Sequence, residues 1–259
     1  MPRRRSTSGL AAAFALLLLV TACRASTPKQ AAQSRPAGAQ VTQAAPAEVA
    51  PTTTTTAYPT FTVATAKVPQ VEIFDEPGAA KPAQTLESPD SWYGVDRVFV
   101  VREKKGDWLK VLLPVRPNES TGWIRAADVD LAEHDYRMVI DVPARRLTAY
   151  KGTDVLVETP VAVGAPSTPT PGGFFYTTQK IRVLPDQRAA YGPYAFGLSA
   201  HSDVLFDFGG GDGQVGIHGT ADVGSIGHNV SNGCIRLPND EITKLAETLP
   251  LGVPVQIVT

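Results

Sequence analysis

Short runs of alternating apolar and polar residues, broken by glycine and proline, dominate the chain from residue 61 onward. Alternation with a period of two is typical of β-strands that bury one face. In the first part of this region it predicts strands at 71–74, 98–101 and 108–112, with turns around Gly78 and Gly106. We therefore expect a small all-β module at 61–132.

The second part of the region, 133–259, shows the same pattern with longer apolar runs. It predicts strands at 136–142, 146–150, 155–163, 174–183, 204–208, 215–218 and 253–258. One helix is predicted where Ile242, Leu245, Ala246 and Leu249 repeat at helical spacing. We expect Asn239 to cap this helix at its N-terminus, and Pro250 and Gly252 to end it.

The N-terminus has the composition of an export signal. Arg3, Arg4 and Arg5 precede an apolar run at 10–20, which is too short for an ordinary membrane span. The run ends in Leu-Val-Thr-Ala-Cys, which resembles the lipoprotein box of bacteria. We predict a signal peptide at 1–23 with Cys23 as the lipidation site; an ordinary cleaved signal or an uncleaved anchor are the alternatives.

Residues 24–60 are rich in alanine, proline, glutamine and threonine. Such a segment buries too little apolar surface to offset the entropy of ordering, so we predict a disordered linker. Proline and threonine tracts of this kind can also be glycosylated, which the sequence does not decide.

The formal net charge is −1 over 259 residues, which gives no reason to expect a nucleic-acid partner. Of the two cysteines, Cys23 is predicted to carry lipid, so Cys234 would have no disulfide partner. A free thiol in an exported protein is exposed to oxidation, which favours a chemical role for Cys234.

Cys234 follows Gly233 and lies sixteen positions after His218. A neighbouring imidazole is the usual means of generating a thiolate at neutral pH, and backbone N–H groups beside the thiol can stabilise an oxyanion. A buried free cysteine and a structural core histidine are the non-catalytic alternative. The glycines around both residues, together with the resemblance of these motifs to a known family, favour a catalytic site.

The sequences His218-Gly219 and Ser231-Asn232-Gly233-Cys234-Ile235-Arg236 resemble the signature of the L,D-transpeptidases of bacterial cell-wall synthesis, the YkuD domain family. Upstream, the segments at 138–141, 146–150, 160–164 and 168–174 follow the opening strands of that family in order. The resemblance covers about the last half of the chain. Many members have histidine at the position of Asn232, which bears on substrate preference.

The resemblance implies an enzyme that needs no cofactor or metal. Cys234 would attack a tetrapeptide stem of peptidoglycan and release D-alanine, and an amine of a second stem would then form a 3→3 cross-link. His218 would accept the thiol proton, and the Gly219 carbonyl would orient its ring. Ser231, Asn232 and Gly233 would shape the substrate pocket. Arg236 would bind a stem carboxylate or pair with an acid in the fold.

In the first module, the segments at 106–111 and 121–124 resemble the end of a bacterial SH3-like barrel. The expected fold is therefore mainly β, an SH3-like small barrel followed by a YkuD-type β-sandwich with a short helix. Tryptophans 92, 108 and 123 are either a ligand platform or core residues.

Other functions remain open at this level. One is a non-catalytic wall-binding lipoprotein; another is a related wall enzyme, either a stem L,D-carboxypeptidase or a protein-to-peptidoglycan transferase. A zinc site at His201, His218, His228 and Cys234 is disfavoured because none of the usual close ligand pairs occurs. We expect a monomer, anchored by lipid to the outer face of the bacterial cell membrane, that acts on peptidoglycan stem peptides.

Overall fold

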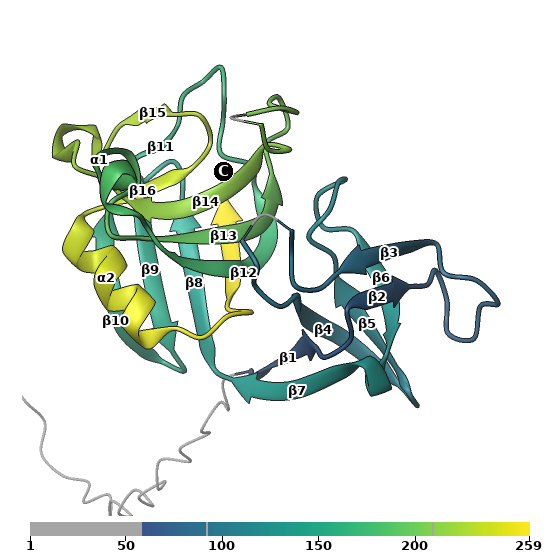
Figure 1. Ribbon diagram of the computed structural model, residues 1–259. Coiled ribbons are helices and arrows are strands. Elements are labelled where there is room, and N and C mark those ends of the chain that lie inside the picture. The colour runs from purple at the N-terminus through teal and green to yellow at the C-terminus, as the bar shows by residue number, and fades with distance from the viewer. Residues whose placement is uncertain (1–58, 92, 209) are drawn as a thin grey trace, which may run out of the picture. The chain divides into compact units, whose positions relative to one another are not determined.

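The computed structural model describes residues 59–91, 93–208 and 210–259 (Figure 1). The predicted signal peptide with Cys23, the predicted linker up to residue 58, and Trp92 lie outside the described residues. Within the described part of the chain the fold is mainly β, as predicted. No helix there has the length and apolar character of a membrane-spanning segment.

We refer to residues 61–134 as the N-terminal module. Its strands are β1 (Phe61–Ala66), β2 (Gln70–Ile73), β3 (Gln84–Glu87), β4 (Val98–Lys105), β5 (Trp108–Leu112), β6 (Thr121–Arg125) and β7 (Val129–His134), with a 3₁₀ turn at Ala126–Asp128. They form a five-stranded sheet in the order β6-β5-β4-β1-β7 and a β2-β3 hairpin. The SH3-like identity of this module stays a prediction.

The two tryptophans of the module that the structure describes, Trp108 and Trp123, serve packing rather than an open platform. Trp123 is buried, and the Trp108 ring packs edge-on against Phe74 with centroids 5.0 Å apart. Large aromatic side chains favour such positions because they bury much apolar area.

The rest of the chain forms a second body of strands. These are β8 (Tyr136–Asp141), β9 (Arg146–Lys151), β10 (Asp154–Pro160), β11 (Val163–Gly164), β12 (Gly173–Arg182), β13 (Tyr194–His201), β14 (Gln214–Gly219), β15 (Asn229–Ser231), β16 (Ile235–Leu237) and β17 (Pro254–Val258). The helices are α1 (Arg188–Tyr191) and α2 (Asn239–Thr248), with 3₁₀ turns at Pro185–Gln187 and Val223–Ser225.

Eight of these strands form one sheet in the order β10-β9-β8-β17-β12-β13-β14-β16. Helix α2 contacts β10 near one end of this order and β13 and β14 near the other, so the sheet curves around the helix (Figure 1). The apolar face of α2 is buried through Ile242, Leu245 and Ala246. Each large side chain buried in this way stabilises the fold by about 1.5–3 kcal/mol.

Helix α2 begins differently from the prediction, whereas it ends at Thr248, shortly before Pro250, as expected. Asn239 was expected to be the N-cap, but the cap position is Pro238 and no side chain caps the helix. The Asn239 amide oxygen instead lies against the backbones of Gly192 and Gly219. At the other end, the Lys180 ammonium group on β12 donates to the carbonyls of Ala246 and Leu249, both at 3.0 Å, which satisfies two of the helix's free C-terminal carbonyls.

The predicted strand at 204–208 is wrong. The strand of this region is β13, which ends at His201, and residues 202–213 connect it to β14. Val204, Phe206 and Phe208 are all about half exposed or more, so their alternation marks no buried face of a sheet. Sequence periodicity could not distinguish them from a half-buried strand.

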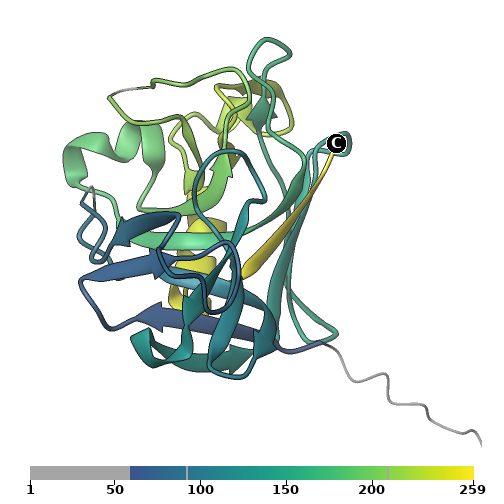
Figure 2. The ribbon, with the colours of Figure 1, turned by 90° about the vertical axis from the view of Figure 1, so that its right-hand side faces the viewer.

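The N-terminal module and the large sheet share a core. Val63, Val98, Val100 and Leu112 of the module pack with the buried ring of Tyr176 on β12. The Tyr176 hydroxyl donates to the Leu112 carbonyl at 3.1 Å. Figure 2 shows the strands of the module lying directly beside those of the larger sheet.

Candidate active site

Cys234 lies in a tight turn between β15 and β16. Gly233 has φ = 111°, a conformation that only glycine adopts without strain. The Ser231 hydroxyl closes the turn: it accepts from the Gly233 N–H at 3.1 Å and donates to the Cys234 carbonyl at 2.5 Å. The sequence suggested that backbone N–H groups beside the thiol stabilise an oxyanion. The Gly233 N–H is not free for this role, because it donates to the Ser231 hydroxyl.

The threonine-rich loop before β12 supports this turn from behind. The Thr170 hydroxyl donates to the Gly233 carbonyl at 2.9 Å and accepts from the Gly164 N–H at the same distance. The Thr168 hydroxyl donates to the Ser231 carbonyl, also at 2.9 Å. These bonds hold the residues on both sides of Asn232 in place, so the thiol has a defined position.

His218 lies near the end of β14, which pairs in parallel with β16, and it is directly opposite Arg236. Its Nδ1 is 2.7 Å from the Gly219 carbonyl oxygen. A carbonyl only accepts, so Nδ1 carries the proton and Nε2 keeps a free lone pair. The Tyr191 ring packs edge-on against the imidazole at 5.0 Å and fixes its other side.

Glycine at position 219 is required by packing. A Cβ there would lie 2.4 Å from the Asn239 amide oxygen and 3.0 Å from the Gly192 Cα. Contacts below 3 Å force the structure to shift. The same glycine therefore provides the carbonyl that orients His218 and the space that lets α1 and α2 approach β14.

The two central groups are both neutral in this environment. The pKa of His218 is lowered to about 4, chiefly by burial; the Gly219 carbonyl opposes this change, and the positive charge of Arg236 adds to it. Burial also raises the pKa of the Cys234 thiol, against the opposing effects of the Gly216 N–H, 3.4 Å from the sulfur, and of Arg236. Burial disfavours both charged forms, so the thiolate that the sequence suggested for Cys234 stays a prediction.

Cys234 and His218 line one pocket of about 90 Å³ together with Ser231, Asn232 and Arg236. Five of the residues singled out in the sequence thus meet in one cavity, and Gly219 and Gly233 set its geometry from the backbone. Three further residues line the pocket that the sequence did not single out: Ala190, Tyr191 and Phe208. No signal near the cysteine motif identifies them, because α1 and the 202–213 segment reach the pocket only through the fold.

Arg236 has an unused hydrogen-bonding group at this site. Its backbone N–H and carbonyl both bond to Ala162 at 2.9 Å, which fixes its main chain. Its side-chain Nε is buried and has no hydrogen-bond partner within the part of the chain that the structure describes. No Asp or Glu there forms an ion pair with it either, which disfavours the structural role that the sequence left open.

The zinc arrangement is not assembled. Among residues 59–91, 93–208 and 210–259, no three His, Cys, Asp or Glu side chains gather as metal ligands would. His201 instead pairs with Asp212 at 3.0 Å, and His228 is exposed.

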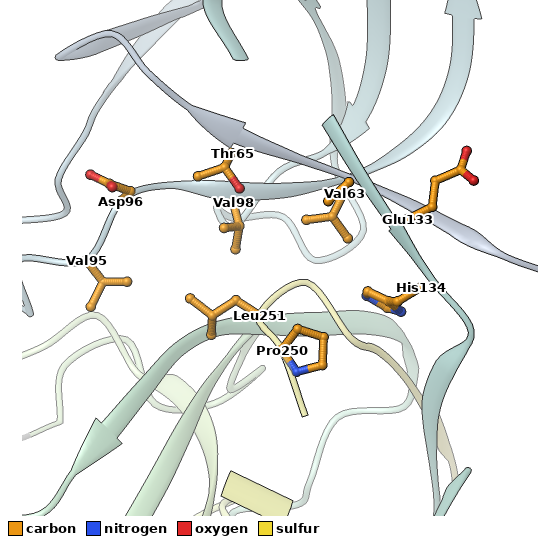
Figure 3. Close-up of a pocket in the computed structure, with 10 residues that line it drawn as sticks. Val63, Thr65, Val95, Asp96, Val98, Glu133, His134, Pro250 and Leu251 are labelled. Atoms are coloured by element: carbon orange, nitrogen blue, oxygen red, sulfur yellow. The ribbon is translucent and has the colours of Figure 1, made fainter. Parts of the chain in front are cut away.

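A larger pocket of about 440 Å³ lies between β1, β4 and β7 of the module and the turn after α2 (Figure 3). Its walls are mostly apolar, with Val63, Val98 and Leu251 facing inward and Asp96 and Glu133 at its edge. None of the candidate catalytic residues lines it.

Comparison with known proteins finds similarity to L,D-transpeptidases. The family model described as L,D-transpeptidase catalytic domain, YkuD, matches residues 135–257. A Bacillus subtilis protein provisionally named L,D-transpeptidase YkuD is 35% identical over 123 residues, covering 47% of this chain and 65% of its own length. L,D-transpeptidase 1 of Mycobacterium tuberculosis is 32% identical over 127 residues, covering 46% of this chain and 49% of its own.

The chain thus spans less than two thirds of the length of either relative. Among solved structures, an L,D-transpeptidase from Mycobacterium smegmatis aligns with a TM-score of 0.40 and 18% identity, over 62% of this chain and 90% of that one. The region of similarity is thus residues 135–257, where the family model of the L,D-transpeptidase catalytic domain matches this chain.

Proposed function

We propose that the protein is a cell-wall L,D-transpeptidase that forms 3→3 cross-links in peptidoglycan through an acyl-enzyme on Cys234. The observation that carries the proposal is the pair in the small pocket: a cysteine in a turn closed by Ser231, and a neutral histidine whose Nδ1 is held by the Gly219 carbonyl. This arrangement supports acyl transfer by a nucleophile with an oriented general base.

In the first half-reaction the Cys234 sulfur attacks the carbonyl between the third stem residue and the terminal D-alanine. His218 Nε2 takes the thiol proton during the attack, since neither group is charged beforehand. The imidazolium returns this proton to the nitrogen of D-alanine, which leaves, and the shortened stem remains as a thioester.

In the second half-reaction the amine of another stem attacks the thioester carbonyl. His218 accepts the amine proton and passes it to the departing sulfur, which restores the thiol. One C–S bond forms and breaks over the cycle. The net result is that the amide bond to D-alanine is replaced by an amide bond to the amine of the second stem.

Arg236 is assigned to a carboxylate of a stem, and Ser231, Asn232 and Gly233 to the walls of the substrate pocket. The unpartnered, buried Nε of Arg236 supports this, because a planar guanidinium binds a carboxylate through two parallel hydrogen bonds. Charge that faces a pocket without a protein partner favours an anionic ligand.

We further propose that the chain is exported and held at the membrane by lipid on Cys23, with the segment 24–60 as its linker. This part rests on the N-terminal sequence alone. A monomer is sufficient, because every residue assigned to the reaction comes from one chain.

Incubation of the protein with disaccharide-tetrapeptide, followed by mass spectrometry of the muropeptides, tests the activity. Transpeptidation should give a 3→3 dimer and free D-alanine in equal amounts. Cys234→Ala and His218→Gln should abolish the dimer, whereas His228→Gln, a change at an exposed histidine, should not. Tripeptide without dimer would indicate a carboxypeptidase. A tripeptide joined only to the amine of an added protein would indicate a protein-to-peptidoglycan transferase. Bound but unaltered stems would indicate a wall-binding protein.

A further inference from the structure

The segment 202–213, described except at residue 209, connects β13 to β14 and is held by the N-terminal module. The Arg116 guanidinium, in the loop between β5 and β6, donates to three of its backbone carbonyls: Ser202 at 2.8 Å, Leu205 at 2.9 Å and Asp212 at 3.0 Å. The same guanidinium lies over the Phe206 ring, 4.5 Å from its centroid. One module side chain therefore binds the segment near its start, middle and end.

Asn118, from the same loop of the module, binds the point where β13 ends. Its amide nitrogen donates to the His201 carbonyl and its amide oxygen accepts from the His201 N–H, both at 2.8 Å. These two hydrogen bonds have the pattern that a paired β-strand would form. Asn118 therefore connects the end of β13 to the N-terminal module. His201 in turn bonds to Asp212 at 3.0 Å across the base of the segment.

These contacts meet a need of the backbone. An irregular segment leaves carbonyls without strand partners, and each requires a donor from elsewhere. Hydrogen bonds from a charged donor are the stronger class, and a guanidinium presents its donors in a fixed fork. Arg116 therefore determines the path of this segment more than the segment's own residues do.

The path matters because the segment reaches the catalytic pocket. Phe208 lines that pocket together with Cys234 and His218. Its backbone exchanges two hydrogen bonds with Gly211, at 2.9 and 3.0 Å, which makes a tight turn at this point. Phe208 is nevertheless about half exposed.

A second element of the module is fixed to β12. The buried carboxylate of Asp90 accepts from the Gln179 side chain of β12 at 2.7 Å and from the Tyr93 N–H at 2.9 Å. The pKa of the Tyr93 phenol is raised, mainly by burial and next by the charge of Asp90. Tyr191 and Cys234 raise it as well.

We propose that the N-terminal module is a working part of the active site, and that Arg116, with Asn118, is a positioning residue for substrate binding. It holds the 202–213 segment so that Phe208 forms one wall of the groove that receives the stem peptide next to Cys234. The part of this that concerns the stem peptide rests on the proposed function; the positioning of Phe208 does not.

The first test compares Arg116→Met with Arg125→Met. Both arginines lie over aromatic rings, but Arg125 contacts Glu72, Phe74 and Trp108 inside the module. In Arg116→Met, amides of the 202–213 segment should exchange with deuterium at least about tenfold faster, since this is the effect expected when opening becomes easier by about 1.4 kcal/mol. Arg125→Met should leave that exchange unchanged.

The same variants are then tested for access to the thiol, which needs no turnover. The rate of Cys234 alkylation by a bulky maleimide, divided by the rate with iodoacetamide, should rise in Arg116→Met and in Phe208→Ala. If Arg116→Met does not fold, Asn118→Ala provides the same comparison. Unchanged exchange or an unchanged ratio in the folded variants overturns the proposal, whether or not the protein is a transpeptidase.

The third test measures substrate binding on the tetrapeptide donor. Arg116→Met should raise KM about tenfold, with kcat changed less than about twofold, and Arg116→Lys should recover part of the loss. Arg116→Met combined with Phe208→Ala should be no worse than either change alone, because both act through the same wall. Additive effects, or an unchanged KM in Phe208→Ala, would refute the assignment of Phe208. Loss of all turnover in the native protein would count against the proposed function and leave the first two tests in force.

Discussion

Protonation of His218 should destabilise the protein, by an amount that can be worked out from its environment. Burial lowers the pKa of this imidazole from 6.5 to about 4. One pH unit of difference corresponds to about 1.36 kcal/mol, so the fall to about 4 corresponds to about 3 kcal/mol in the free energy of unfolding.

The sign follows from which state binds the proton. The unfolded chain takes up a proton at His218 as the pH falls below about 6.5, whereas the folded protein does so only near pH 4. The stabilising contribution is therefore complete above pH 6.5. It decreases as the pH falls from 6.5 to 4.

Urea unfolding followed by tryptophan fluorescence at pH 7 and pH 4 measures this contribution. His218→Asn should lose about 3 kcal/mol less stability over this interval than the native protein, because the buried site no longer titrates. Contributions from His201 and His134 are present in both proteins and cancel. The matched control is His228→Asn, at an exposed position, which should follow the native protein. Equal losses in His218→Asn and in the native protein would show that the imidazole is not held neutral by burial, and the proposed general base would lose its main support.

Four further predictions concern the site and the anchor. Burial raises the pKa of Cys234, so alkylation by iodoacetamide should need a pH above about 8.5, the pKa of free cysteine, both in the native protein and in a variant without His218. Rapid reaction at pH 7 would contradict this. Gly219→Ala places a methyl group 2.4 Å from a side-chain oxygen and should cost about 1–3 kcal/mol in thermal unfolding, whereas Gly224→Ala, with its nearest neighbour at 3.5 Å, should cost little. A carbapenem should form one covalent adduct by intact-protein mass spectrometry, absent in Cys234→Ala; an adduct that survives this change would exclude the cysteine as the nucleophile. Cys23→Ala should abolish labelling with a lipid probe, and undiminished labelling would exclude this lipidation site.

The local sequence predicted much of this structure because its signals are short-range. The alternation at 136–150 predicted β8 and β9 nearly to the residue, and the helical repeat of Ile242, Leu245 and Ala246 predicted the buried face of α2. Each of these patterns reflects the burial of one face of a single element, and the spacing of that element's apolar residues is enough to predict it.

The predictions that were wrong concern segments whose local structure depends on residues far away in the sequence. The alternation at 204–208 looks like a strand, yet Arg116, far earlier in the chain, takes up the carbonyls of this segment. Asn239 looks like an N-cap, yet its amide packs against two glycines instead. Local rules cannot foresee a partner that only the fold brings near.

The candidate site divides in the same way. Cys234, His218 and Gly219 were identifiable in the sequence because nucleophile, base and orienting carbonyl lie in two short motifs. Their charge state was not, because it depends on how deeply the surrounding strands and helices bury them, and burial is a property of the assembled protein. The tertiary structure alone brings Tyr191 and Phe208 to the pocket and joins Arg116 to the 202–213 segment, since these contacts connect segments that no sequence spacing relates.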